Sequence, residues 1–467
     1  MTRSVDTSSD RQQPKPGQIV EVTGLDLDRQ GHGLARWQGW VLVIPDLLPG
    51  EQAEVQLQQR RRSQWLGRLL KTLKPASGRQ HPPCILAADC GGCSLQHLQD
   101  SQQSLLKQQQ LQQTLTRIGE INHPIEPLLS AKGRSFGYRN RGLIPLRRGQ
   151  DGKLRMGYYK RGSHRIVNLN RCPVLDPRLE QCLQPIKQDL QERDWPADPD
   201  LQSGDGLRHL GLRIGHASGE ILITLISSTA SLPGLHQQAR TWLERWDQVR
   251  GVTLNLQPKR NNLILGTQTS LLAGEAAITE NFCGLTLRLA TTTFFQINTP
   301  QAEQVVEILC EWFSRQGSTK AVIDAYCGIG TIALPLAAAG LKVLGLELNE
   351  ASVEQARNNA RLNGLRDVQF RSGDVVDHLA ASLPKYDGLV VDPPRKGLND
   401  AVVETILNHP PRSMAYLSCD PATLARDLKK LTTPDGPYRI ELVQPVDFFP
   451  QTTHVECLVL MTRCSCD

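Results

Sequence analysis

Short apolar runs alternate with helical stretches over the last third of the chain. The strand-type runs read AVIDAY, KVLGLE, VQFRSGD, YDGLVVD, SMAYLSC and YRIELVQPVD. The stretches with a helical pattern lie between them, at 331–339, 350–362, 375–383, 400–408 and 421–431. Strands that alternate with helices are typical of a parallel sheet covered on both faces. We therefore expect an α/β fold, with a doubly wound Rossmann-like domain over 294–467 that binds its ligand at the carboxyl ends of the strands.

The start of the chain has a different pattern, of short β-type runs broken by Gly, Pro and Asp. Five such runs predict an OB-type β-barrel over 15–75. Arg60, Arg61 and Arg62 would give this barrel a positive face, as in barrels that bind single-stranded or looped RNA. A barrel that serves only protein interaction is the alternative. The polar residues 1–14 are expected to form a disordered tail.

Residues 76–293 form a third region, in which short β runs alternate with Gly, Asn and Pro breaks. This pattern predicts a mostly β central domain. One stretch differs, because near 95–120 leucines recur at roughly helical spacing among many glutamines. The leucine stripe predicts one long amphipathic helix that packs against the protein, rather than a low-complexity segment.

Charge is divided unevenly along the chain. Residues 1–180 contain 27 Lys and Arg against 15 Asp and Glu, whereas residues 181–467 contain 26 against 32. A basic half is typical of proteins that bind a polyanion, and a merely solubilising surface is the alternative. No apolar run reaches the roughly 18 residues of a membrane span. The N-terminus also has no apolar secretory signal, so we expect a cytoplasmic protein without membrane contact.

Twelve cysteines are many for a cytoplasmic protein, and without an export signal they favour metal binding or catalysis over disulfides. Cys84, Cys90 and Cys93 form C-x5-C-x2-C, and Cys172 follows at a distance. Four thiolates suit either zinc or an iron–sulfur cluster. The unequal spacing and the distant fourth cysteine favour the cluster over a zinc ribbon.

The first strand of the C-terminal domain meets its helix in DAYCGIGT, where Gly328 and Gly330 let the backbone approach a ligand. No Lys follows and G-x-G-x-x-G is absent, which excludes a P-loop and argues against a dinucleotide site. Glu347, Asp374 and Asp392 end the next three strands, where acids can bind ribose hydroxyls or reach adenine. A ligand with ribose and adenine but no pyrophosphate clamp fits S-adenosylmethionine. For any single acid, a helix N-cap is the alternative role.

Cys419 ends the fifth strand in LSCDP, just before a helix. A helix N-terminus lowers the pKa of a thiol, so we expect a reactive cysteine at the sheet edge that binds the donor. Glu456 opens the last strand, which is otherwise apolar, and a general base would explain a carboxylate there. A solvated or ion-paired strand end is the alternative. Cys464 and Cys466 are expected to lie in a mobile C-terminal tail, and metal binding by this C-x-C pair is the alternative.

The motifs SCDPATLARD, DAYCGIGTIALPLA, VVDPPRKGL, FFQIN and HVECLVL resemble those of the RNA 5-methyluridine methyltransferases. The resemblance runs over nearly the whole chain. It is greatest to the bacterial 23S rRNA uracil-C5 methyltransferases with a TRAM barrel and an iron–sulfur cluster. It implies an S-adenosylmethionine-dependent methyltransferase fold, RNA as the partner, and a [4Fe–4S] cluster on Cys84, Cys90, Cys93 and Cys172.

The resemblance also implies roles for single residues. Cys419 would add to C6 of uracil, which makes C5 nucleophilic towards the methyl sulfonium, and Glu456 would then remove the C5 proton. Phe294 and Phe295 are placed to stack on or wall the flipped base. Donor-binding roles fall on Gln296, Tyr326, Thr331, Glu347, Asp374 and Asp392, although Tyr326 and Thr331 stand where many relatives have Phe and Asn.

Two other functions stay open. The first is 5-methyluridine formation in tRNA, although the tRNA-specific branch usually lacks both the barrel and the cluster. The second is a non-catalytic iron–sulfur RNA-binding protein, against which the intact Cys419 and Glu456 argue. DNA cytosine methylation is disfavoured because the cysteine follows Ser rather than Pro, and amino-group methylation because Arg395 follows Asp-Pro-Pro. No obligate protein partner is expected.

Overall fold

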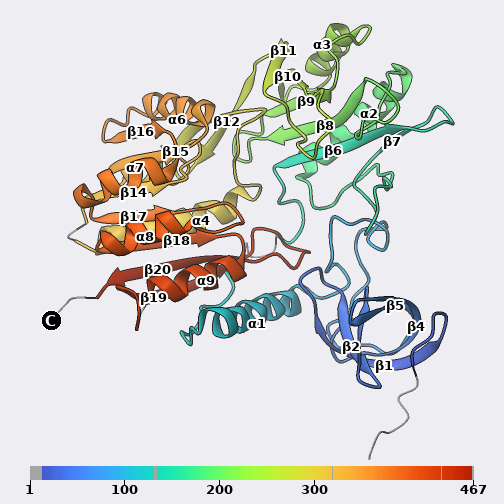
Figure 1. The fold of residues 1–467 in the computed structure, drawn as a ribbon. Helices are drawn as coiled ribbons and strands as arrows, with labels where there is room; N and C mark the ends of the chain where they lie inside the picture. Colours follow the sequence, from blue (N-terminus) through green and yellow to red (C-terminus); the bar gives the residue numbers. More distant parts are fainter. Residues whose placement is uncertain (1–12, 131–133, 318, 433, 465–467) are drawn as a thin grey trace, which may run out of the picture. The chain divides into compact units, whose positions relative to one another are not determined.

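The computed structural model describes residues 13–130, 134–317, 319–432 and 434–464 (Figure 1). Of the tail expected over 1–14, residues 1–12 lie outside the described part of the chain. The chain divides into two compact units. The described residues of the first unit are 13–88, 92–104 and 451–453, and those of the second are 89–91, 105–130, 134–317, 319–432, 434–450 and 454–464.

The first unit contains a closed five-stranded barrel with the strand order β1-β2-β3-β5-β4. In β1, exposed and buried positions alternate, which places one row of side chains inside the barrel. The interior is apolar and includes the fully buried Leu42, Ile44, Val55 and Leu57. The predicted small barrel is confirmed. Its strands are β1 (Ile19–Leu27), β2 (Gly33–Trp37), β3 (Trp40–Ile44), β4 (Gln52–Arg61) and β5 (Gln64–Lys74).

The leucine-striped helix is present as α1 (Asp100–Gly119), slightly shorter than the expected 95–120. From Leu105 onward it belongs to the second unit. Leu111 and Leu115 are fully buried there, in one apolar cluster with strands of the C-terminal sheet. The stripe therefore packs against the protein, as the leucine spacing predicts.

A six-stranded central sheet has the order β11-β10-β9-β8-β6-β7 within the described residues. Two helices not anticipated by the β pattern, α2 (Pro177–Glu192) and α3 (Leu235–Arg245), accompany it. A separate hairpin, β12 (Ala277–Phe282) and β13 (Leu285–Ala290), follows in the chain. The six strands are β6 (Arg141–Arg148), β7 (Leu154–Met156), β8 (Leu207–Ile214), β9 (Ile221–Ser227), β10 (Val249–Leu256) and β11 (Gln268–Gly274).

The C-terminal sheet has seven described strands in the order β16-β15-β14-β17-β18-β20-β19. β14 pairs in parallel with β15 on one side and with β17 on the other, so the strand order reverses at β14. Ligands of doubly wound sheets bind at such a reversal. The strands are β14 (Ala321–Ala325), β15 (Lys342–Glu347), β16 (Val368–Ser372), β17 (Gly388–Val391), β18 (Ser413–Ser418), β19 (Tyr438–Val446) and β20 (Glu456–Arg463).

Helices cover both faces of this sheet, as the alternating pattern predicts. One face packs against helices α4 to α6, and the other against α7 to α9 and the second half of α1. None of the helices in the described part of the chain is long and apolar enough to cross a membrane. Their bounds are α4 (Thr299–Arg315), α5 (Ala333–Ala338), α6 (Glu350–Leu362), α7 (Val375–Ser382), α8 (Asp400–Asn408) and α9 (Pro421–Leu431).

β20 runs antiparallel between β18 and β19, with Ser418 opposite Cys457. The first residue of β20 therefore lies at the edge where β18 ends. This arrangement brings Glu456 next to the end of the strand that leads into Cys419, although 37 positions separate the two residues in the sequence.

Candidate active site

A cavity of about 950 Å³ lies in the second unit, at the carboxyl edge of the C-terminal sheet. The residues that line it come from the ends of β14, β15, β17 and β18, from the start of β20, and from the segment before α4. All eight residues predicted to bind the donor or to react line this one cavity: Gln296, Tyr326, Thr331, Glu347, Asp374, Asp392, Cys419 and Glu456.

The turn after β14 has the backbone conformation that its glycines suggest. Gly328 and Gly330 adopt positive φ angles of 54° and 87°. A Cβ on Gly330 would lie 2.9 Å from the Leu334 side chain, so the position has no room for a larger residue. Tyr326 also has a positive φ, of 70°, which is uncommon for a residue other than glycine and marks a constrained turn at the cavity wall.

Glu347 braces this turn from the end of β15. Its Oε2 accepts a hydrogen bond from Gly328 N at 3.2 Å, and its Oε1 accepts one from Asn349 N at 2.7 Å. The carboxylate thus fixes the turn and also lines the cavity. Asp374 also has two roles. It is the N-cap of α7, where its side chain accepts a hydrogen bond from Val376 N at 3.1 Å, and it lines the same cavity.

Cys419 lies half-buried between β18 and α9. Burial is the main cause that raises the pKa of its thiol to about 11, the carboxyls of Glu456 and Asp392 add to the increase, and Arg395 opposes it. The expectation of a lowered thiol pKa was therefore wrong. The first free N–H groups of α9 are taken by the Asp420 side chain, which accepts from Ala422 N and Thr423 N at 2.9 and 3.1 Å. The helix N-terminus is thus already occupied by a carboxylate.

Glu456 is only 6% exposed, so the solvated strand end considered for it is not what the structure has. Burial raises the pKa of its carboxyl to about 8, with a further increase from Asp392, while Arg395 lowers it. Burial also raises the pKa of Asp392, to about 7. Acids that titrate near neutrality can both accept and return a proton at physiological pH.

The two neighbouring phenylalanines of FFQIN have opposite surroundings. Phe294 is 64% exposed and lines the cavity. Phe295 is 3% exposed, and its ring packs edge-on against Phe282 at a centroid distance of 5.4 Å. Phe295 belongs to the apolar core, so the prediction that it walls the base was wrong.

Arg395, Phe449 and His454 also line the cavity and were given no role in the reaction from the sequence. The rings of Phe449 and His454 lie 5.7 Å apart. The main-chain carbonyl of Phe449 accepts from Lys107 Nζ, which also bonds Asp447 Oδ1 at 2.7 Å. His454 lies two residues before Glu456 in the sequence, and that spacing was the only signal for it.

The four cysteines of the expected cluster are divided between the units. Cys84 and Cys93 belong to the first unit, and Cys90 and Cys172 to the second. Cys172 is buried and the others are half-buried. In the part of the chain that the structure describes, no group of three or more His, Cys, Asp or Glu could hold a metal ion. Cys464 is exposed, and Cys466 lies outside the described residues.

Three protein families match parts of the chain. The TRAM domain family matches residues 13–70, the family described as methyltransferase small domain matches 301–415, and the family described as tRNA (uracil-5-)-methyltransferase matches 376–464. These matches fall on the barrel and on the sheet that carries the cavity.

Relatives match the chain over almost its full length. An uncharacterized RNA methyltransferase of Parasynechococcus marenigrum is 59% identical over 460 residues, which cover 98% of each chain. An uncharacterized RNA methyltransferase of Synechocystis is 43% identical over 95% of this chain and 96% of its own. Another from Bacillus cereus is 34% identical over 96% and 97%.

One solved structure has the same fold over nearly the whole length. It is the tRNA (uracil-54, C5)-methyltransferase of Pyrococcus abyssi in complex with S-adenosyl-L-homocysteine, with a TM-score of 0.76 and 24% identity. The match covers 94% of this chain and 99% of that one.

Proposed function

The chain belongs to the RNA uracil-5 methyltransferase family, and from this premise we propose that it methylates C5 of a specific uridine in 23S rRNA. It is an S-adenosylmethionine-dependent RNA methyltransferase. The proposal concerns the covalent mechanism, the residues and the RNA. One observation carries it: Cys419, Glu456 and Asp392 line the same cavity as the glycine turn and the strand-end acids of the donor site.

The donor would be held by Glu347, Asp374, Asp392, Tyr326, Thr331 and Gln296. Glu347 ends β15, which is where an acid can accept hydrogen bonds from ribose hydroxyls. S-adenosylmethionine supplies a methyl group on a positively charged sulfur. Phe294, exposed at the cavity wall, is the aromatic face on which a flipped uracil would stack.

The reaction needs a nucleophile at C6 because C5 of uracil is too electron-poor to attack the methyl sulfonium. The Cys419 thiolate forms a C–S bond to C6, and the electrons of the C5–C6 double bond become available at C5. C5 then bonds the methyl carbon, and the electron pair of the broken S–CH₃ bond stays on the sulfur of S-adenosylhomocysteine. Glu456 takes the C5 proton, the C5–C6 double bond re-forms, and Cys419 leaves as a thiolate.

Both reacting side chains begin in the protonated form at neutral pH, given pKa values of about 11 for Cys419 and about 8 for Glu456. The thiol must therefore lose its proton before or during addition. Arg395 lowers the pKa of both groups, so this cation favours their reactive forms. Arg395 directly follows Asp392-Pro393-Pro394, so this motif supplies the cation that favours the reactive forms of Cys419 and Glu456.

We also propose that Cys84, Cys90, Cys93 and Cys172 hold a [4Fe–4S] cluster. The support is the number and type of these residues in the sequence, since four thiolates complete the coordination of such a cluster without another ligand; within its described residues the structure gathers no three metal-binding side chains. With a fourth cysteine as ligand, each iron of the cluster has a protein ligand, and none is free to bind a substrate. No step of the methylation uses the cluster.

The choice of 23S rRNA over tRNA rests on the resemblance of the sequence motifs to the 23S rRNA enzymes. The fold does not decide between the two RNAs, because the tRNA (uracil-54, C5)-methyltransferase of Pyrococcus abyssi shares it over 94% of this chain. Mapping of 5-methyluridine in rRNA and tRNA from cells that lack this protein tests the choice. One 23S rRNA position should lose its methyl group while tRNA is unchanged. Loss at a tRNA position instead would assign the enzyme to tRNA, with the same chemistry.

The covalent mechanism is tested with RNA that contains 5-fluorouridine, because fluorine cannot be removed as a proton and the adduct persists. The purified protein with donor should form an adduct that survives denaturing electrophoresis, and Cys419→Ala should form none and lose all methylation. Cys310→Ala is the matched control, because Cys310 is a half-buried cysteine of α4 that does not line the cavity. Turnover by Cys419→Ala would refute the mechanism.

A further inference from the structure

Within residues 291–299, Phe294 and Gln296 line the cavity together with Thr292 and Ile297, on a segment without regular structure until α4 begins. Inward and outward positions alternate along it. Thr291 and Thr293 are buried, whereas Phe294 points to the cavity. Loops are ordinarily more mobile than the elements they join. Here the backbone of the segment is held at both ends by side chains of the central sheet.

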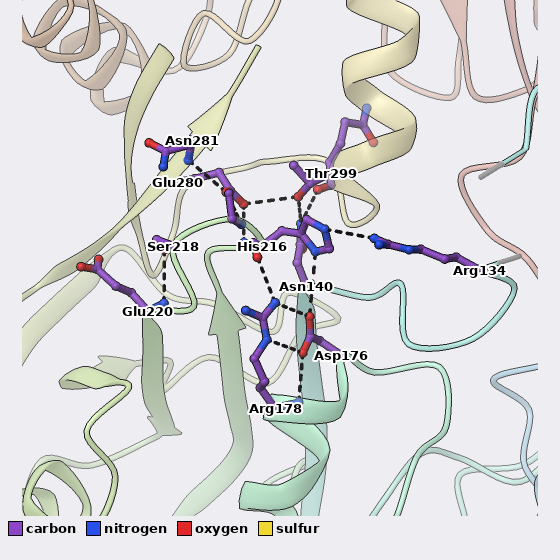
Figure 2. A network of polar contacts seen from close by, with 12 residues as sticks. Arg134, Asn140, Asp176, Arg178, His216, Ser218, Glu220, Glu280, Asn281 and Thr299 are labelled. Atoms are coloured by element: carbon purple, nitrogen blue, oxygen red, sulfur yellow. Dashed lines mark hydrogen bonds and ion pairs between the residues drawn. The ribbon is translucent and has the colours of Figure 1, made fainter. Parts of the chain in front are cut away.

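Asn140 holds the second end (Figure 2). Its Nδ2 donates to the main-chain oxygen of Gln296 at 2.8 Å and to Thr299 Oγ1 at 2.9 Å, and its backbone N donates to Ile297 O at 2.9 Å. Thr299 Oγ1 in turn donates to Glu280, a fully buried carboxylate that also accepts from His216 N at 2.6 Å. The main-chain oxygen of Gln296 is thus held by Asn140, and Asn140 is itself linked through Thr299 to the buried Glu280.

Two arginines hold the first end. Arg141 Nη2 donates to Thr291 O at 2.8 Å, and Arg213 Nη2 donates to Thr293 O. The Thr291 hydroxyl is fixed as well, since it bonds the hydroxyls of Thr224 and Thr253 at 3.1 and 2.9 Å. The carbonyls of Thr291 and Thr293 are therefore held by donors on β6 and β8, and the carbonyl of Gln296 by the residue just before β6.

The choice of arginine at this place is unusual. Arg141 and Arg213 are directly opposite each other on β6 and β8, and like charges in that relation repel. Among the described residues no carboxylate forms an ion pair with either one. Burial lowers the pKa of both guanidinium groups, that of Arg141 to about 10. Buried charges without a partner destabilise a fold, so stability does not explain these two residues.

We propose that Arg213, together with Arg141 and Asn140, is a positioning residue for the transfer reaction. The three fix the backbone of residues 291–296 so that Phe294 and Gln296 face the cavity before any substrate binds. The planar guanidinium suits this task because it offers several donors in a fixed fork, whereas a neutral side chain of this length does not. The inference rests on the proposed function, because Gln296 and Phe294 gain their roles from it.

The test compares Arg213→Met with Arg208→Met. Arg208 is the matched control: it lies in the same strand, is 3% exposed, and donates to the carbonyls of Pro199, Gln257 and Lys259. The loop that it holds contributes no residue to the cavity. Each variant is measured for unfolding temperature, for binding of S-adenosylhomocysteine by calorimetry, and for single-turnover methyl transfer to RNA.

Arg213→Met should keep or raise its unfolding temperature, since an apolar residue of similar length removes a buried charge. Its single-turnover rate should fall on the order of 100-fold, because small displacements of reacting groups cost that much. Arg213→Lys, which keeps the charge but not the fork, should recover part of the rate. Arg208→Met should keep the wild-type rate.

Asn140→Asp is the second variant, should Arg213→Met fail to fold. It preserves shape but replaces the donating amide by a carboxylate, and it should slow transfer in the same way. Equal rate losses in Arg213→Met and Arg208→Met, or no loss in Arg213→Met and Asn140→Asp, would overturn the inference. A wild-type protein that binds S-adenosylhomocysteine but methylates no uridine would instead refute the proposed function.

Discussion

Glu456 begins a strand that is otherwise apolar, and its burial has consequences for pH. A carboxyl whose pKa is raised to about 8 is mostly protonated at pH 7. It can accept the C5 proton only when it is ionised. The rate of product formation should therefore rise between pH 6 and pH 9, and a pH–rate profile measured under single-turnover conditions checks this.

Glu456→Gln should separate addition from elimination. The amide cannot take the C5 proton, so the methylated adduct on Cys419 should accumulate, visible as a mass increase of the protein–RNA complex. Glu441→Gln is the matched control, because Glu441 lies in the neighbouring strand β19 and bonds Trp312 and Thr462 outside the cavity. A Glu456→Gln variant that forms no adduct, as Cys419→Ala does, would disprove the base assignment.

The same carboxyl should make the protein less stable in mild alkali. Its folded pKa lies above the unfolded value of 4.5, so its contribution to stability is present below that value and is lost as pH rises through about 8. The unfolding temperature of the wild type should fall more between pH 5 and pH 8 than that of Glu456→Gln. An equal fall in both proteins would contradict this.

At the scale of elements, the order of strands and helices in the C-terminal domain was predictable because local signals agree with the tertiary fold. The apolar runs are the buried strands, and the expected helices begin at capping residues such as Asn349, Asn399 and Asp420. The acids at the strand ends were placed on one edge for the same reason.

Other features could not be predicted because they depend on tertiary surroundings. Nothing local distinguishes Phe294 from Phe295, and only the packing against Phe282 decides which one is core. The raised pKa of Cys419 comes first from burial and then from the carboxyls of Glu456 and Asp392, which lie at the ends of other strands. The two arginines that hold the loop before Gln296 carry no sequence signal, since Arg is ordinarily exposed.

The segment that bears Cys84, Cys90 and Cys93 should bind iron together with Cys172 if the proposed cluster is present. Protein purified without oxygen should contain about four iron atoms per chain and be brown, as a closed four-thiolate cluster requires. Cys172→Ser should lose iron, whereas Cys182→Ser, at a buried cysteine within α2, should not. Iron analysis and visible absorption check both variants, and a colourless protein with zinc would refute the cluster.

For the whole molecule, the uneven charge predicts how RNA binding responds to salt. Arg60, Arg61 and Arg62 are exposed at the end of β4 and just beyond it, and the Arg60 guanidinium lies 4.8 Å from the Trp40 ring centre. Replacing the three by Ala should weaken RNA binding and reduce the slope of log affinity against log salt by about 0.7 per lost phosphate contact. Binding of S-adenosylhomocysteine should not change.

The control for this charge removal is a triple variant in the acidic part of the chain. Arg240, Lys342 and Arg366 are exposed there, and their replacement removes the same charge. Salt titrations of RNA binding should leave this control close to the wild type. Equal losses in both triple variants would show that net charge alone, rather than the barrel, binds the RNA.

The core of the C-terminal sheet includes Leu111, Leu115 and Ile121, about 300 positions before Leu424 and Tyr438, which belong to the same cluster. Contacts of such sequence separation slow folding, because a long loop must close before they form. A fragment that ends at residue 294 lacks the later members of this cluster. Its Leu111, Leu115 and Ile121 would be exposed to solvent, and the fragment should aggregate. During synthesis, residues 111–121 leave the ribosome long before residues 424–438. The helix that bears Leu111 and Leu115 can therefore be buried only after the last strands have been made.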